Sequence, residues 1–210
     1  MKLLERKATM ENSKGFVHIM TQINATGRQK MEGYWQDALE CIYDWERETI
    51  EDIIWNTFDS DSMLAQFLPR LQKYDGIEKL RKSLTKYSIP CDASVEIAQV
   101  LYAETEDEQY LDVIIENIKK AKVKYSYLAI LGRCKPNKKA ESFLRDVIIE
   151  SENDLERNTA ATALLQYLGI IHDLNNMSEY IANMDLVKAI TNENKEVRVE
   201  ALRSLMGIYV

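Results

Sequence analysis

Glycine and proline, the residues that most often interrupt regular backbone structure, are scarce in this sequence. Only seven glycines and three prolines occur among 210 residues. Tight β-hairpins usually turn through Asn-Gly or Asp-Gly, and Asp75-Gly76 is the one pair of that kind. The scarcity of both residues therefore predicts an all-α protein with long helices joined by short polar turns.

Cysteine and histidine are too few and too scattered to form the usual metal or redox sites. The three cysteines, Cys41, Cys91 and Cys134, lie far apart in no Cys-x-x-Cys pair, so we expect buried free thiols instead of disulfides or zinc ligands. Neither His18 nor His172 has a second histidine three or four residues away. We therefore expect no metal and no cofactor.

Recognisable catalytic motifs are missing as well. The chain has no Gly-x-Gly phosphate loop and no Gly-x-Ser-x-Gly nucleophile elbow. The pair His172-Asp173 could act as an oriented base, but a surface-turn histidine beside a helix cap is the simpler interpretation. Adjacent carboxylates such as Glu51-Asp52 point in different directions on a helix, so acid–base pairing would need partners from other helices. The sequence thus gives no catalytic residue and favours a binding protein over an enzyme.

Long apolar runs and strong positive net charge are also absent. No stretch approaches the roughly 18 apolar residues of a membrane span, and the charged segment Met1–Lys7 lacks the apolar core of a secretion signal. The net charge is −7, which does not favour nucleic acid or anionic lipid as a partner. We therefore expect a cytoplasmic protein that does not bind membranes, and we leave its oligomeric state open.

Apolar residues at helical spacing dominate the first part of the chain after a polar segment, residues 1–14. From Arg28 to Phe58 the pattern predicts one long helix, or two helices that meet near Arg47–Thr49. Ser60–Ser62 is expected to end this helix and to cap the next one. We interpret residues 1–75 as an N-terminal helical cap.

Two segments further along share the pattern Arg-x-x-Ala-x-x-x-Leu at an offset of 41 residues, 157–164 and 198–205. Each follows an Asn- or Asp-rich helix cap. Alanine and leucine four residues apart share one helix face, so the small alanine lets a neighbouring helix approach while the leucine fills the space between layers. An offset near 40 with two helices per unit is the size of a HEAT or armadillo repeat.

These units resemble HEAT-like repeats of the short, lyase-type bacterial kind, in which an Asn- or Asp-rich turn precedes Val-Arg and an Ala/Leu helix. Residues 194–198 have this pattern, and residues 154–157 have it with Glu156 in place of valine. The resemblance implies a right-handed, armadillo-like α-solenoid of stacked antiparallel helix pairs over residues 76–210, continuous with the cap. It transfers no catalytic residue. Chance similarity between two amphipathic helices is the alternative.

Charge is distributed unevenly along the chain. Residues 119–145 contain nine lysines and arginines and one acid, whereas residues 32–61 contain ten acids and one base. Because helix ends in a solenoid gather on shared edges, the cations are expected to form one basic ridge, or else a dispersed, solvated set. The candidate partner-binding residues are Lys119, Lys122, Lys124, Arg133, Lys135, Lys139 and Trp55.

Trp55 is included because the three tryptophans, Trp35, Trp45 and Trp55, are ten residues apart and spiral around a helix instead of lining one face. Trp55 is the candidate to lie off the core stripe, and an exposed tryptophan there could act as a binding anchor. The alternative is that it packs against the next helix pair.

Together these features favour a non-catalytic scaffold that binds another protein. If the basic ridge is the binding surface, we expect that protein to be acidic. The alternative is a nucleic-acid-binding protein that resembles the HEAT-like DNA alkylation-repair glycosylases, which use a basic concave face with aromatic residues. A lyase-like or chaperone-like role in cofactor attachment is suggested by the resemblance alone.

Overall fold

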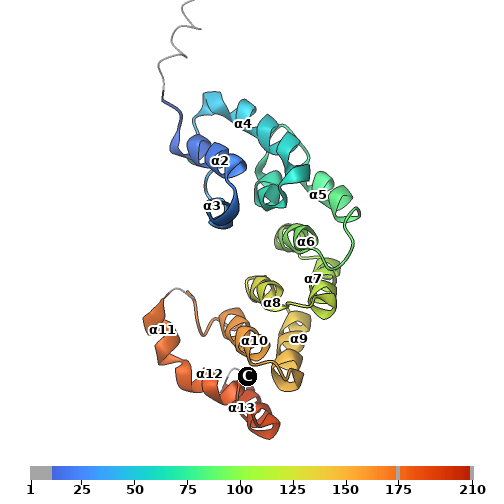
Figure 1. Cartoon of the computed structure of the whole chain (residues 1–210), viewed down its shortest axis with the longest axis vertical. Helices are drawn as coiled ribbons and strands as arrows, with labels where there is room; N and C mark the ends of the chain where they lie inside the picture. The colour runs from blue at the N-terminus through green and yellow to red at the C-terminus, as the bar shows by residue number, and fades with distance from the viewer. Residues whose placement is uncertain (1–10, 174–175, 209–210) are drawn as a thin grey trace, which may run out of the picture. The chain divides into compact units, whose positions relative to one another are not determined.

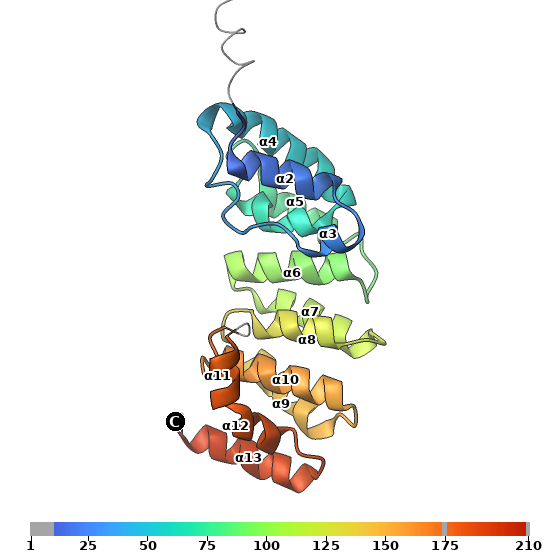
Figure 2. The same ribbon diagram turned by 60° about the vertical axis from the view of Figure 1, so that its left-hand side comes forward.

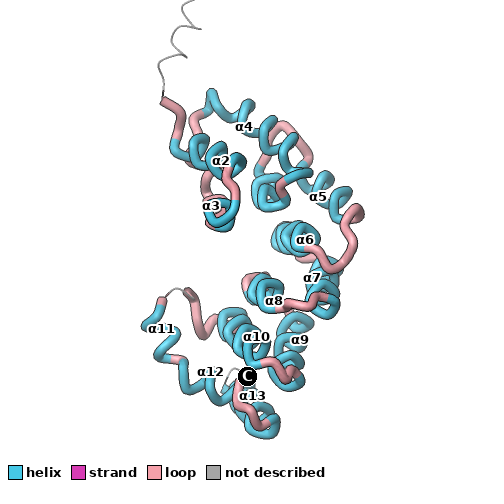
Figure 3. Tube along the Cα trace, in the orientation of Figure 1, coloured by secondary structure: helices cyan, strands magenta, loops and turns pink. Residues whose placement is uncertain are grey.

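The computed structural model describes residues 11–173 and 176–208, and all regular structure in these ranges is helical (Figures 1 and 3). The prediction of an all-α protein is therefore confirmed. The chain forms two compact units, Met1–Tyr87 and Ser88–Val210. The predicted segment 1–14 lies mostly outside the described residues, and α2 begins at Lys14.

The first unit contains α2 (Lys14–Asn24), α3 (Gly27–Met31), α4 (Asp44–Thr57), the 3-10 helices η1 (Phe58–Ser60) and η2 (Ser62–Arg70), and α5 (Gly76–Leu84). The second contains α6 (Asp92–Thr105), α7 (Glu108–Lys120), α8 (Tyr125–Gly132), α9 (Lys138–Glu150), α10 (Asp154–Tyr167), α11 (Met177–Ala182), α12 (Met184–Ile190) and α13 (Lys195–Ile208).

The long helix predicted between Arg28 and Phe58 is wrong. α3 ends at Met31, and turns occupy the chain until α4 begins at Asp44. Gly33 has a φ of +73°, a conformation that glycine adopts without steric cost. Buried Glu46, in the first turn of α4, accepts hydrogen bonds from the backbone N–H groups of Tyr43 and Ser13, each at 3.0 Å. The turn at Gly33 and the carboxylate of Glu46, which caps α4, thus interrupt the helix that the apolar pattern predicted.

The boundary between the units follows α5, later than the position after residue 75 that the sequence suggested. α5 packs against η2 so closely that a Cβ on Gly76 would lie 1.9 Å from the carbonyl oxygen of Leu68. The core of this unit is apolar and includes the fully buried rings of Phe58 and Phe67. Asp61 precedes η2, but its carboxylate accepts hydrogen bonds from Lys30 and Tyr34 instead of capping that helix. The expected break at Ser60–Ser62 is confirmed, with Asp61 in the N-cap position of η2, but the Asp61 side chain makes no capping hydrogen bond.

In the second unit, α6, α8 and α10 lie side by side, and α7 and α9 form a layer behind them (Figures 1 and 2). The layers bury an apolar core that includes Leu101, Leu111 and Leu164. α8 and α10 approach closely where Gly132 meets Ala163, because a Cβ at Gly132 would lie 2.6 Å from the Ala163 Cβ. Small residues thus set the spacing within the layer.

The last helices depart from this alternation. α12 packs against α10, and α13 packs against α12 and α9 (Figure 1). α13, which carries the second copy of the repeated pattern, is thereby a neighbour of α9 in the layer behind α10.

Candidate partner-binding surface

α8 divides the predicted cations into two groups. Lys119 and Lys124 lie before its N-terminal end, whereas Arg133 and Lys135 follow its C-terminal end. The eight residues of α8 span about 12 Å along the helix axis. The cations therefore fall into two groups, one at each end of α8, instead of following one shared edge as the ridge prediction assumed.

The cluster after α8 is bound to acids from the preceding helix pair. The ammonium group of Lys135 lies 2.8 Å from a carboxylate oxygen of Glu106. Lys139 lies 2.9 Å from Asp112 and 3.5 Å from Glu108. The hydrogen bond to Asp112 raises the pKa of Lys139, so its charge is compensated within the unit. These lysines hold the α8–α9 loop and the start of α9 against α7.

The cluster before α8 is also partly compensated. Lys124 lies 3.4 Å from Glu156, and Lys119 lies 3.2 Å from Glu116 on its own helix. Both lysines line a groove of about 360 Å³ between the ends of α7 and α9. The apolar side chains of Ile118, Phe143 and Val147, together with Asp146, Glu150, Ser151 and Glu156, complete its lining.

Three cations of the basic segment have exposed side chains with no acidic partner among the described residues. They are Lys122, Arg133 and Lys138. Lys122 lies before α8, and the other two lie beyond its far end. Of the candidate residues named from the sequence, Lys122 and Arg133 are thus the two whose charges are available to a partner.

The solvent-facing side of α8 and α10 carries an uncharged hollow whose exposed lining is mostly apolar. The hollow has a volume of about 210 Å³ and is lined by Ala129, Asn158, Thr159, Thr162, Ala163 and Gln166. Asn158, Thr162 and Gln166 recur every four residues and therefore share one face of α10. The hydroxyl of Thr162 donates to the carbonyl of Asn158, and Gln166 Oε1 is buried without a partner in this part of the chain. The four-residue spacing of these polar side chains is visible in the sequence, but the distribution of charge does not indicate it.

Trp55 is not an exposed anchor. Its indole is half-buried, stacked on Tyr74 with ring centroids 4.4 Å apart, and the ammonium of Lys79 lies 4.3 Å from the ring centre. Trp35 and Trp45 are the more exposed tryptophans, at 50% and 38%. The spacing argument does not apply to all three tryptophans, because Trp35 lies outside the helices, in the connection between α3 and α4.

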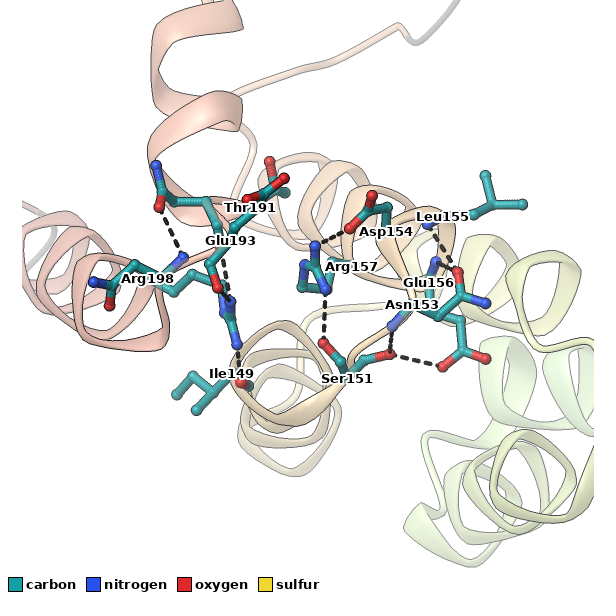
Figure 4. Close-up of polar contacts among 12 residues, drawn as sticks. Ile149, Ser151, Asn153, Asp154, Leu155, Glu156, Arg157, Thr191, Glu193 and Arg198 are labelled. Carbon is teal, nitrogen blue, oxygen red and sulfur yellow. Dashed lines mark hydrogen bonds and ion pairs between the residues drawn. The ribbon is translucent and has the colours of Figure 1, made fainter.

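The arginines of the repeated pattern are structural. Arg157 and Arg198 are each 5% exposed, and both reach the C-terminal end of α9 (Figure 4). Arg157 donates to the Ser151 carbonyl at 3.0 Å and pairs with Asp154. Arg198 donates to the Ile149 carbonyl at 2.6 Å and to the turn before its own helix. Both cations therefore satisfy carbonyls at the negative end of a helix dipole.

The histidines contact neighbouring segments, whereas only one of the three cysteines, Cys134, is buried; Cys41 is exposed and Cys91 is partly exposed, so the expectation of buried thiols is wrong for these two. His18 Nε2 accepts a hydrogen bond from the Trp35 backbone N–H at 3.0 Å, and its ring stacks on the Trp35 indole. The backbone N–H of His172 donates to Glu179 at 2.8 Å. Burial raises the pKa of the Cys134 thiol to about 12. Within the described residues, no group of three or more His, Cys, Asp or Glu side chains is placed to hold a metal ion.

None of the helices in the described ranges is both long and apolar enough to cross a membrane. Comparison with protein-family models, curated proteins and solved structures gives no match for this chain. Its function is therefore inferred from the geometry of the two units.

Proposed function

We propose that the second unit is a HEAT-like, right-handed α-solenoid and that the protein is a non-catalytic scaffold that binds another protein. The repeated pattern supports the architecture, because each arginine donates to the turn that precedes its own helix, Arg157 to the Ser151 carbonyl and Arg198 to the Asn192 and Glu193 carbonyls. The shared direction of α6, α8 and α10 leaves one side of this layer open to a partner.

The uncharged hollow on α8 and α10, whose exposed lining is mostly apolar, supports this side of the unit as the place where the partner binds. Its hydroxyl and amide groups offer hydrogen bonds without the desolvation cost of buried charge. Lys122 and Arg133 flank it, one beyond each end of α8. A protein segment with two separated acidic groups matches this arrangement, because the two cations lie beyond opposite ends of α8.

Thr162→Arg tests the hollow directly, because a long cation on α10 blocks it without entering the core. The matched control is Ser204→Arg, which adds the same side chain at an exposed position of α13. Both variants and the parent chain are used as baits, and captured proteins are quantified by mass spectrometry. We expect Thr162→Arg to lose at least tenfold of a specific partner that Ser204→Arg retains. Equal capture by both variants contradicts the assignment.

Nucleic acid has less support as the partner, because Lys124, Lys135 and Lys139 are already paired with acids. We expect no retention on immobilised duplex DNA at ~50 mM salt, a condition under which phosphate contacts are strong. Retention that falls steeply as salt increases, and that Lys122→Glu with Arg133→Glu abolishes, favours the nucleic-acid alternative.

A further inference from the structure

A second groove, in the first unit, is lined by lysines and aromatic rings. It has a volume of about 450 Å³ and lies beside α5 and the segment that precedes α5. Its lining consists of Trp55, Lys73, Tyr74, Asp75, Glu78, Lys79, Lys82, Ser83 and Lys86. Four ammonium groups thus meet two carboxylates along one groove, although the whole chain is acidic.

The aromatic rings hold two of these lysines in place. Trp55 and Tyr74 stack, Lys79 lies over the outer face of Trp55, and Lys73 lies 5.5 Å from the Tyr74 ring centre. Lys79 also donates to the carbonyl of Trp55. Because both ring faces of this stack carry an ammonium group, the aromatic pair positions cations and leaves no free face for a planar ligand.

The two lysines nearest the end of α5 are held only loosely. Lys82 lies 3.3 Å from Glu78, and Lys86 lies 3.7 Å from Asp59. Their side chains are 73% and 63% exposed. Ion pairs this exposed contribute little to stability, so an anion with several charges can displace the carboxylates. Asp59 also faces Lys79, at 3.6 Å, and Lys73 is the most firmly paired of the four, with Asp52 at 2.8 Å.

Ser83 supplies an independent observation. Its side chain is 1% exposed and lines the groove, yet its Oγ has no hydrogen-bond partner in the described residues. A buried hydroxyl without a partner is costly. If the Ser83 side chain rotates so that its buried Oγ faces the groove, an anion there accepts its hydrogen bond and removes that cost.

We propose that this groove binds an oligophosphate anion, such as inorganic triphosphate or the phosphate tail of a nucleotide. Lysine binds phosphate as a mobile point charge, and Lys79, Lys82 and Lys86 recur on one side of α5 and just beyond its end. Several phosphate charges match several ammonium groups, whereas a single carboxylate cannot replace Glu78 and Asp59 together. The Ser83 hydroxyl donates to a phosphate oxygen.

Isothermal titration calorimetry of the full chain with inorganic triphosphate, ATP and adenosine tests the proposal. We expect triphosphate and ATP to bind with dissociation constants within about threefold of each other, and adenosine to give no heat. Absence of binding by triphosphate overturns the proposal, as does ATP binding that adenosine matches, because the base would then be the recognised group.

Variants separate this groove from general positive charge. Lys82→Ala with Lys86→Ala should weaken triphosphate binding at least tenfold, whereas Lys119→Ala with Lys120→Ala, a similarly exposed pair on α7, should leave it unchanged. Glu78→Gln should tighten binding, because it frees Lys82. Ser83→Ala should weaken binding while raising the melting temperature, since it removes an unpartnered hydroxyl. Equal weakening by the two lysine pairs overturns the assignment.

Discussion

At the scale of single residues, buried carboxylates organise the first unit. Glu46 and Glu51 are each 1% exposed, and both accept backbone N–H groups from distant segments. Periodicity predicted that α4 would be helical, but it assigned no partner to these acids. Such partners come from tertiary structure, because Ser13 and Gln72 lie far from the two acids in the sequence.

Glu51 is expected to make stability depend on pH. Burial alone would raise its pKa, but hydrogen bonds from Arg47 and from the backbone of Gln72 and Lys73 outweigh that effect and lower the pKa. Its contribution is complete above about pH 4.3, the unfolded-state pKa, and is lost as pH falls through the lower folded-state pKa. We expect Glu51→Gln to cost roughly 2 kcal/mol at pH 7, measured by urea unfolding. The same difference at pH 3 would contradict this origin.

His18 gives a second pH-dependent contact. Its Nε2 accepts the Trp35 N–H, and burial lowers its pKa below the usual value of 6.5. Protonation removes the acceptor, so this contact is present above the unfolded-state pKa and is lost as pH falls through the lower folded-state pKa. We expect the Trp35 amide resonance in NMR spectra to titrate with a midpoint below 6.5. In His18→Gln, whose amide oxygen is also an acceptor, the titration should vanish; its persistence would assign the transition to another group.

At the scale of elements, the sequence predicts a helix best where a capping residue and the apolar spacing indicate the same starting point. Asn153 caps α10 as the repeat predicted, by accepting from the backbone N–H groups of Leu155 and Glu156. Pattern failed between α3 and α4, where Trp35 and Ala38 have helical spacing but lie in turns. There the positive φ of Gly33 and the hydrogen bond from the Ser13 backbone N–H to Glu46 determine the path of the backbone. Apolar spacing predicts neither feature.

The docking of α13 provides a test at this scale. Arg198 joins α13 to the Ile149 carbonyl on α9, and its guanidinium is buried. Arg198→Ala leaves carbonyls of α9 and of the turn before α13 unpaired, so we expect a loss of roughly 2–4 kcal/mol. Hydrogen exchange should increase chiefly in residues 195–205. Arg203→Ala, on the exposed side of the same helix, is the control and should leave the exchange unchanged.

At the scale of the whole molecule, the basic block of the sequence has few acids beside it along the chain but several acids beside it in space. The basic block of residues 119–145 lies in the second unit together with Glu106, Asp112 and Glu156, which pair with three of its lysines. The sequence identified the cations of the candidate surface but not their partners, because the pairs join residues about thirty positions apart.

The division into two units predicts that residues 88–210 fold without the first 87. Each unit has a core of its own, with Phe58 and Phe67 in the first and Leu101 and Leu164 in the second, and separate cores are the mark of independently folding domains. We expect the isolated segment to show helical circular dichroism, one cooperative thermal transition and capture of the same partners as the full chain. An unfolded segment would show that the second unit depends on the first. If the segment folds but captures no partner, the binding surface is instead assigned to the first unit, where Trp35 and Trp45 are exposed.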